Sequence, residues 1–549
     1  MNRQRKKGRL IAYLLAVGLL LASVVGCSST SAPTDKQNDA GKSNASNLVP
    51  KNGGTVTIGL PEEPDSLDPQ KSQMATASLV TSFLGGALLY LDPKTLEVKP
   101  HLAESYTASE DGKTLTFKIR SGVTFHDGTP LTAKSFKETF DRALSPDMAG
   151  SVTSFMLGSV KSVSAPDDKT LVLELKEASA TILPTLADSA YLQPLSMEAI
   201  KKQGKDYLRN PVGVGPWKFE SWKTGESITL VRNEAYKWGD GMSENQGPPR
   251  PDKLVIKFIK DRSTMVAAMD SGAIDIGVNL PPKDASKYRK NEKFTLLESL
   301  KTGISFLNFN LSSATLQDSN VRKALNIAIN KEAIIQADLK GEGEPAYGPL
   351  PPTLFGYDEN IEQYAYKFST EEAKKLLEAA GWKENAQGIR EKDGKTLSLT
   401  MVASDPLPGN QLIQSMLKEI GIDLKIQVLE TATMIEVTNE GKFDICRSRY
   451  AYFDPDVLFV FMHSSQIGGL NTGRVNDKQL DSLLVKGRTT MDLGERKKTY
   501  QEIQKLAVEQ AYLVPLYMPK EFNLVNNRIQ GVKQYPRVGI VLQDVWVNE

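Results

Sequence analysis

The sequence predicts an α/β protein with mixed sheets, and two kinds of apolar periodicity together with the chain length support this. Residues 114–120 and 170–176 alternate apolar and polar side chains, as half-buried strands do. Residues 321–334 instead repeat apolar side chains every three or four positions, which is typical of a helix with one buried face. A chain of 549 residues is also long enough for two or more hydrophobic cores.

The first 26 residues have the composition of an export signal. Five Arg and Lys side chains between Arg3 and Arg9 precede an uncharged apolar stretch from Leu10 to Val25. That stretch is shorter than the ~20 residues that are needed to cross a bilayer. We therefore expect residues 1–26 to be a signal peptide and the rest of the chain to be exported.

The signal ends at a cysteine. Residues 24–27, Val-Val-Gly-Cys, resemble a bacterial lipobox, in which the chain is cut before a cysteine that then carries lipid. Two or more acyl chains hold a protein stably on a membrane. Residues 28–50 are rich in Ser, Asn, Ala and Lys and contain no aromatic side chain, so we expect residues 27–52 to be a lipidated Cys27 and a flexible tether. An ordinary signal peptide with an unrelated cysteine is the alternative.

The most distinctive internal stretch is SGVTFHDGTPLTAKSFKETFDRAL, residues 121–144. Its Asp-Gly pair predicts a turn, and Thr132 predicts the start of a helix on which Phe136 and Phe140 share a face. His126 stands beside the turn and could belong to a metal site or an acid–base pair. A turn that caps a helix uses the same residue types, and we favour this structural interpretation.

Helices and strands alternate in the second half of the chain. Ser369 has the spacing of a capping box at the start of a helix that Gly381 ends. A further helix ends at Gly421, and residues 422–428 then alternate as a strand does. From about residue 301 onward this order predicts an α/β lobe with a mixed or parallel sheet.

Composition excludes several classes of protein. The formal net charge of +1 gives no electrostatic reason to expect nucleic acid as a partner. If Cys27 carries lipid, Cys446 has no partner for a disulfide, and we expect it to be a small buried apolar residue. The chain contains only three histidines, no HExxH motif and no G-x-S-x-G motif. We therefore expect no catalytic residues, no metal site and no cofactor.

Four segments carry a family likeness. They are DGKTLTFKIRSGVTFHDGTPLTAKSFKETFDRAL, NPVGVGPWKFESW, ITLVRNEAYKW and NVRKALNIAINKEAI, in this order. Together they resemble the peptide- and nickel-binding family of solute-binding proteins that serve ABC importers. The likeness extends over the chain from about Gly53 to its end.

The resemblance implies a two-lobed periplasmic-binding-protein-like fold with a hinge and a larger N-terminal lobe. On this chain, lobe one would be residues 53–300 plus 522–549, and lobe two would be residues 301–521. The implied protein is a monomer that traps a solute between its lobes and delivers it to ABC permease subunits in the membrane. The lipid anchor would hold it on the outer face of the cell membrane of a Gram-positive bacterium.

The family also implies where the solute binds. In peptide-binding members, the segment that matches residues 441–459 helps to line the cleft, and an aspartate four residues before a proline pairs with the free amine of the peptide. This chain has Ala451 at that position, so the sequence does not identify the residue that would bind the amine. Asp454 and Asp456 are the nearby carboxylates and the candidates for this contact.

Two arginines are further candidates for the site. Arg447 falls at the position of a cleft arginine in oligopeptide binders, and Arg449 lies on the same face of the predicted strand. Either could bind a carboxylate of the solute, an internal carboxylate, or solvent at the end of the strand. Tyr450 could stack on a ligand or pack internally, and Asn471 lies on a glycine-rich loop that could reach the cleft.

We predict short peptides as the solute. A nickel complex, a metal–opine or another anionic amino-acid conjugate is the alternative, because two arginines are present and the amine-binding aspartate is missing. Two other functions are compatible with the sequence. They are a receptor subunit that senses a signalling peptide and a cell-surface hydrolase.

Overall fold

The structure is a computed structural model that describes residues 49–548. The predicted signal peptide, Cys27 and nearly all of the predicted tether lie outside the described residues. From Pro50 onward the chain forms one compact unit. No helix in this described part is long and apolar enough to cross a membrane.

A mixed sheet of twelve strands is the largest element within residues 49–548. β1 pairs in parallel with β10 and β11, whereas β9, β8 and β13 join by antiparallel pairing. β18 pairs in parallel with both β19 and β20, as the predicted alternation of helices and strands after residue 301 requires. The strands of its main path are β19 (Asp423–Val428), β18 (Ser398–Ala403), β20 (Ile445–Arg449), β13 (Ser305–Phe309), β21 (Leu513–Asn526), β11 (Ile276–Gly277), β1 (Thr55–Leu60), β10 (Lys253–Phe258), β9 (Ser227–Arg232) and β8 (Trp217–Lys223).

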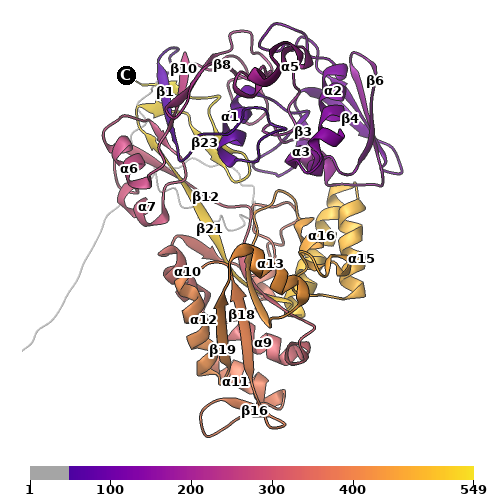
Figure 1. The fold of residues 1–549 in the computed structure, drawn as a ribbon, viewed down its shortest axis with the longest axis vertical. Coiled ribbons are helices and arrows are strands. Elements are labelled where there is room, and N and C mark those ends of the chain that lie inside the picture. The colour runs from indigo at the N-terminus through magenta and orange to yellow at the C-terminus, as the bar shows by residue number, and fades with distance from the viewer. Residues whose placement is uncertain (1–48, 549) are drawn as a thin grey trace, which may run out of the picture. The chain divides into compact units, whose positions relative to one another are not determined.

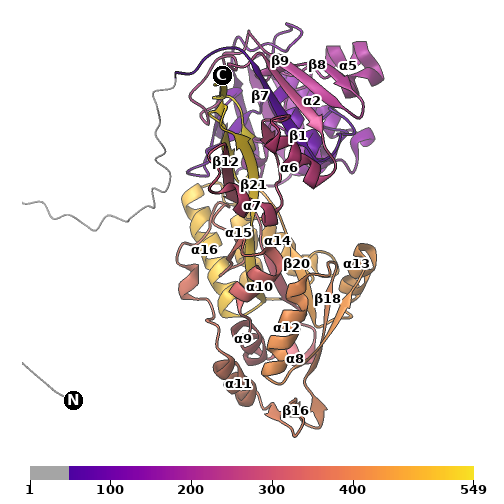
Figure 2. The same cartoon turned by 90° about the vertical axis from the view of Figure 1, so that its left-hand side faces the viewer.

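The long strand β21 runs through both parts of this sheet (Figures 1 and 2). Its first residues pair with β13, its middle pairs with β14 (Gly343–Pro345), and its last seven residues pair with β12 (Phe294–Leu300). The register shifts where Ser305 of β13 meets Tyr517, and Pro519 follows within the same strand. Bulges and prolines interrupt a regular ladder, so β21 is least regular between the two parts.

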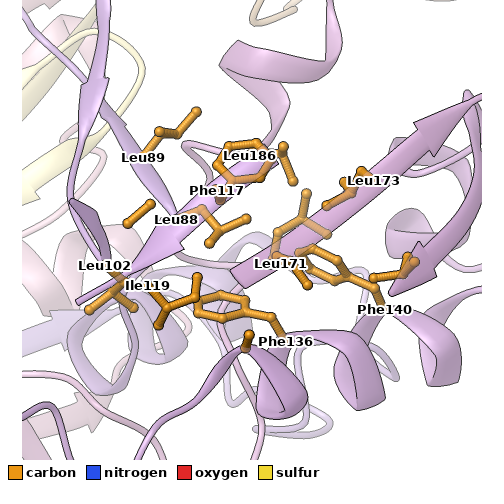
Figure 3. Packing of buried hydrophobic residues seen from close by; sticks show 14 of the residues in the cluster. Leu88, Leu89, Leu102, Phe117, Ile119, Phe136, Phe140, Leu171, Leu173 and Leu186 are labelled. Carbon is orange, nitrogen blue, oxygen red and sulfur yellow. The ribbon is translucent and has the colours of Figure 1, made fainter. Parts of the chain in front are cut away.

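A separate antiparallel sheet of four strands confirms two of the predicted strands. β5 (Thr114–Ile119) and β7 (Thr170–Leu175) lie at its centre, between β4 (Ala103–Ala108) and β6 (Val160–Asp167). The predicted helix after Thr132 is α2 (Ala133–Ala143), which begins with a capping box. Figure 3 shows Phe136 and Phe140 of α2 facing Phe117 and Leu171 of this sheet. All four side chains are buried.

The prediction of one continuous helix over residues 321–334 was wrong. The structure has two helices there, α9 (Ser319–Ile327) and α10 (Lys331–Leu339). The side chain of Asn330 accepts a hydrogen bond from the backbone N–H of Ala333 at 3.0 Å and so starts a new helix. The apolar side chains still share one buried face, because both helices pack into the same core.

The other helix starts and ends predicted for the second half are confirmed, but the capping box at Ser369 forms only in part, because the N–H of Ser369 donates to the carbonyl of Ile327 and not to the side chain of Glu372. The side chain of Ser369 accepts a hydrogen bond from the N–H of Glu372 at 3.2 Å and begins α11 (Thr370–Ala379). Gly381 and Gly421 have φ angles of +88° and +85°, a conformation that glycine adopts without steric cost. α12 (Pro408–Glu419) precedes Gly421 and β19, as the sequence pattern indicates.

The hydrophobic cores divide the unit into two groups. Three clusters draw their buried side chains from residues 56–294 and 522–547, which we call the N-terminal core group. The other three use residues 304–518, which we call the C-terminal core group, and Cys446 is buried there. Within the described chain, the two groups are connected by residues 295–303 and by β21.

Smaller elements complete the unit, and α15 packs against α16 (Figures 1 and 2). The helices are α1 (Ala75–Leu84), α3 (Val152–Met156), α4 (Ile182–Thr185), α5 (Met197–Gln203), α6 (Arg262–Asp270), α7 (Pro282–Tyr288), α8 (Ala314–Gln317), α13 (Thr431–Glu440), α14 (Val457–Met462), α15 (Lys478–Thr489) and α16 (Leu493–Glu509). The short strands are β2 (Leu89–Leu91), β3 (Val98–Pro100), β15 (Lys383–Glu384), β16 (Arg390–Lys392), β17 (Lys395–Thr396), β22 (Ile529–Gln530), β23 (Lys533–Tyr535), β24 (Gly539–Val541) and β25 (Trp546–Val547).

Candidate functional site

A large cavity lies where the two core groups meet, and we call it the junction cavity. Its volume is about 520 Å³. α1 and residues 187–191 and 536–540 line it from the N-terminal core group. Lys301 lines it from the connecting segment, and Ala451 lines it from the residues that follow β20. Residue 451, where the family likeness implies an amine-binding aspartate, therefore lines this cavity. Its side chain is the methyl group of an alanine.

Two carboxylates line the junction cavity. Oδ1 of Asp188 accepts hydrogen bonds from the backbone N–H groups of Ala190 at 2.9 Å and Tyr191 at 3.0 Å. Burial raises the pKa of Asp188, although the nearby Arg537 acts in the opposite direction. Burial also raises the pKa of Glu521, whose charge is partly offset by Lys301. Both carboxylates have lost hydration that a cationic group of a solute could replace.

Arg537 also lines the junction cavity. Its Nη2 donates a hydrogen bond to the carbonyl of Pro184, and its guanidinium carbon lies 5.1 Å from the centre of the Phe453 ring. Nη1 is buried and has no hydrogen-bond partner among the described residues. Burial lowers the pKa of Arg537. The guanidinium is therefore fixed by its surroundings and sits beside Asp188 without forming an ion pair within 4.0 Å in the described chain.

A second cavity, of about 370 Å³, adjoins the end of β20, and we call it the β20 cavity. Apolar side chains dominate its lining, including Met434 and Ile435 of α13 and the exposed Leu470. Arg447 and Arg449 both line it, together with Cys446 and Ser448 between them on the strand. This cavity offers apolar surface with cationic groups at its wall.

The two arginines differ in what they contact. Nη1 of Arg447 donates to Oδ1 of Asn410 at 2.6 Å, and Nη2 donates to the carboxylate of Asp338. Both charged groups of that pair are buried, so Arg447 has an internal partner. The side chain of Arg449 is 75% exposed and lies 3.1 Å from Asp405. Only Arg449 of these two is free to reach a solute without breaking a buried ion pair.

The two predicted carboxylates are paired as well. Asp454 and Arg496 form an ion pair at 2.6 Å, and each side chain is only 2% exposed. Asp456 forms an ion pair with Arg488 at 2.7 Å, and burial raises the pKa of Asp456 in spite of that partner. An amine contact at Asp454 or Asp456 stays a prediction, and a solute amine would have to displace an arginine to make it.

Tyr450 and Asn471 make contacts within the chain. The hydroxyl of Tyr450 donates to the carbonyl of Pro349, and its ring packs at 5.8 Å from that of Phe461. Asn471 is fully buried, donates to the carbonyls of His463 and Val475 at 3.0 Å each, and accepts from the Val475 N–H at 3.1 Å. Their roles in solute binding likewise stay predictions.

Asp188, Glu521 and Arg537 were not identified from the sequence. Asp188 lies more than 300 residues before Glu521 and Arg537 along the chain, and no motif marks any of the three. The one usable signal was Ala451, because a missing carboxylate on one wall of a binding site directs attention to the other walls. Among the described residues, no three His, Cys, Asp or Glu side chains are grouped so that they could hold a metal ion.

Comparison with known proteins identifies the class. Residues 97–469 match the family profile described as "Bacterial extracellular solute-binding proteins, family 5 Middle". This match covers more than half of the chain, so the chain belongs to the bacterial extracellular solute-binding proteins of family 5. The family fits a unit in which a cavity lies between two core groups.

Individual relatives extend over most of the chain. The oligopeptide-binding protein AppA of Bacillus subtilis is 29% identical over 564 aligned residues, which cover 100% of this chain and 99% of AppA. The heme-binding protein A of Haemophilus influenzae is 30% identical, with 80% of this chain and 82% of that protein covered. The chain is thus similar to binding proteins whose names give very different solutes.

The solved structure of AppA from Bacillus subtilis in complex with a nonapeptide is similar in fold as well. Its TM-score is 0.67 at 28% sequence identity, and the alignment covers 91% of this chain and 100% of that one. The chain therefore has the two-lobed α/β fold of periplasmic binding proteins, as the sequence predicted. It is a solute-binding protein of the kind that serves importers.

Proposed function

We propose that this protein captures short peptides in the junction cavity and delivers them to ABC permease subunits in the membrane. The observation that carries the proposal is that this cavity is lined by the N-terminal core group, by Lys301 and Glu521 of the connecting segments, and by Ala451 of the C-terminal half. A solute that contacts both walls binds the closed arrangement more tightly than an open one, and so stabilises it. No bond of the solute is made or broken in this process.

The size and charge of the junction cavity support a peptide. About 520 Å³ lies within the range of roughly 300–1,000 Å³ that is usual for small-ligand pockets. Asp188 and Glu521 supply negative charge, and Lys301 supplies positive charge, on its walls. A short peptide carries both charges at its ends. The similarity to AppA over the full chain agrees with this solute class.

The lobe boundaries belong to this proposal. Lobe one would comprise residues 53–300 and 522–549, and lobe two residues 301–521. The membership of the two core groups supports these limits, since it changes between residues 294 and 304 and between 518 and 522. The protein would act as a monomer, with residues 295–303 and β21 as the hinge.

We also propose that a lipidated Cys27 tethers the protein to the outer face of the cell membrane of a Gram-positive bacterium. The lipobox-like sequence and the composition of residues 28–50 support this. Mass spectrometry of the protein extracted from membranes tests it, because lipidation adds the mass of the acyl chains to a chain that begins at Cys27. A Cys27→Ala variant is expected to appear in the culture medium.

A carboxylate-rich conjugate is the second candidate solute, and Arg449 favours it. This side chain is exposed at the wall of the β20 cavity, where a bidentate carboxylate could replace Asp405 as its partner. The solute would then place its apolar part against α13. A metal complex of such a conjugate would bind through its carboxylates.

Native mass spectrometry distinguishes the two solutes. The full chain is purified from cells grown in rich medium, kept in mild detergent, and examined for bound masses. A ladder of masses that matches peptides of mixed sequence supports the proposal. A single small anionic or metal-containing mass, which Arg449→Ala loses and the exposed Lys498→Ala keeps, supports the second candidate and contradicts peptide capture.

A further inference from the structure

The junction cavity lacks a carboxylate at the wall where the family likeness places one. Ala451 lines the cavity there, and a methyl group accepts no hydrogen bond. A peptide ammonium carries three donors and a full charge, and burying it without an acceptor is unfavourable. If the cavity holds the amino end of a peptide, as the proposed function requires, the acceptor has to come from another wall.

Asp188 is placed to supply this acceptor from the N-terminal core group. It follows α4 on the segment of residues 187–191 that lines the cavity. The N–H groups of Ala190 and Tyr191 hold Oδ1 in place, and Oδ2 has no hydrogen-bond partner among the described residues. A carboxylate that is fixed through one oxygen and open at the other is preorganised for a charge-assisted hydrogen bond.

The charged groups around Asp188 leave its carboxylate available to a solute. Arg537 lies near enough to favour the ionised carboxylate, but its Nη2 is bound to Pro184 and its face covers Phe453. In the described chain it forms no ion pair with Asp188 within 4.0 Å. Glu521, the other carboxylate of the lining, has Lys301 near it in the same way, also without an ion pair within 4.0 Å in the described chain. The two carboxylates differ in how they are held, because backbone N–H groups fix Oδ1 of Asp188 and leave its other oxygen open.

We propose that Asp188 binds the free amino group of the peptide, in place of the aspartate that residue 451 does not provide. The inference rests on the proposed function and adds to it that recognition of the amine comes from lobe one. Closure then brings the peptide, already held by its amine, against Ala451 and the end of β20. A peptide with a blocked amino end should not be retained.

The test uses an enzymatic digest of casein below 1 kDa as the probe, together with the same digest after acetylation of its amino groups. The full chain in mild detergent is titrated with each, and native mass spectrometry gives an apparent Kd for every retained peptide mass. The variants are Asp188→Asn, Glu521→Gln and the double variant Asp188→Asn with Ala451→Asp. Asp167→Asn is the matched control, because Asp167 also accepts a backbone N–H, that of Lys169 at 2.8 Å, in an exposed turn.

We expect the wild type and Asp167→Asn to retain peptides of the digest and to reject the acetylated peptides. Asp188→Asn should weaken retention by about 30-fold or more, as truncation of a buried charge pair does. Asparagine can still accept the two backbone hydrogen bonds, so the thermal unfolding midpoint should not change. Restoring a carboxylate with Ala451→Asp should recover at least part of the affinity.

Other results overturn the inference. Equal retention by Asp188→Asn and the wild type, equal retention of acetylated peptides, or a loss in Glu521→Gln that exceeds the loss in Asp188→Asn each contradicts it while peptide capture itself stands. A wild type that retains no peptide from the digest contradicts the proposed function, and the inference with it.

Discussion

The ion pair between Asp454 and Arg496 predicts that Asp454→Asn strongly destabilises the protein. The two side chains are joined by contacts of 2.6 and 3.1 Å, and each is 2% exposed. Burial opposes the charge of Arg496, yet Asp454 raises the pKa of Arg496 overall. Removing one partner of a buried pair leaves an uncompensated charge and costs about 3–5 kcal/mol. We expect a loss of this size in the free energy of unfolding.

Urea unfolding followed by circular dichroism measures this loss, and a peptide titration on the same samples measures binding. The control is Glu495→Gln, which breaks the pair with Lys498 at 2.9 Å between side chains that are 54% and 69% exposed. Such a surface pair contributes about 1 kcal/mol or less. If Asp454→Asn unfolds at the same urea concentration as the wild type and loses peptide binding, Asp454 is a solute contact and the reasoning from the ion pair is wrong.

Three further predictions concern single side chains. Burial lowers the pKa of His126 to about 4, below its value of about 6.5 in an unfolded chain, so the unfolded chain takes up the proton first as the pH falls. The free energy of unfolding should therefore decrease by about 2 kcal/mol from this group between pH 7 and pH 5, and urea midpoints of His126→Asn should decrease less than those of the wild type. Gly215→Ala would place a Cβ atom 2.5 Å from the carbonyl carbon of Leu84, so we expect a lower melting temperature, whereas Gly247→Ala, whose Cβ would meet nothing closer than 3.6 Å, should change it little. Burial raises the pKa of Cys446 to about 11, so iodoacetamide should label this thiol at pH 8 only in urea, and rapid labelling of the native protein would contradict the buried position.

The elements that the sequence predicted well are those whose signal is local. β5 and β7 alternate apolar and polar side chains over six residues each, and their inward side chains are buried as the alternation requires. The cap of α11 depends on Ser369 and on a residue three positions later. The break between α9 and α10 also had a local signal, because Asn330 is a residue type that starts helices. The prediction missed it because the apolar stripe continues past Asn330.

The site was less predictable because its contacts connect distant segments. Asp454 and Asp456 are near Ala451 in the sequence, but their partners Arg496 and Arg488 lie on or at the end of helices that come later in the chain. The spacing of apolar and polar residues along the sequence does not predict such ion pairs. Whether a carboxylate binds an internal arginine or a solute depends on which helix packs against it, and tertiary packing decides that.

The path of the chain between the two core groups connects the proposed amine site to closure. Residues 295–303 and β21 join the groups, and β21 is least regular near its register shift and Pro519. A Cβ atom on Gly303 would lie 1.7 Å from the carbonyl oxygen of Tyr450, so this connection packs directly against the segment that ends at Ala451. Any rotation of the groups about these connections therefore moves Ala451 relative to Asp188, which lines the same cavity from the N-terminal core group. An amine held at Asp188 would bind before closure, and the contacts at the end of β20 would form during it.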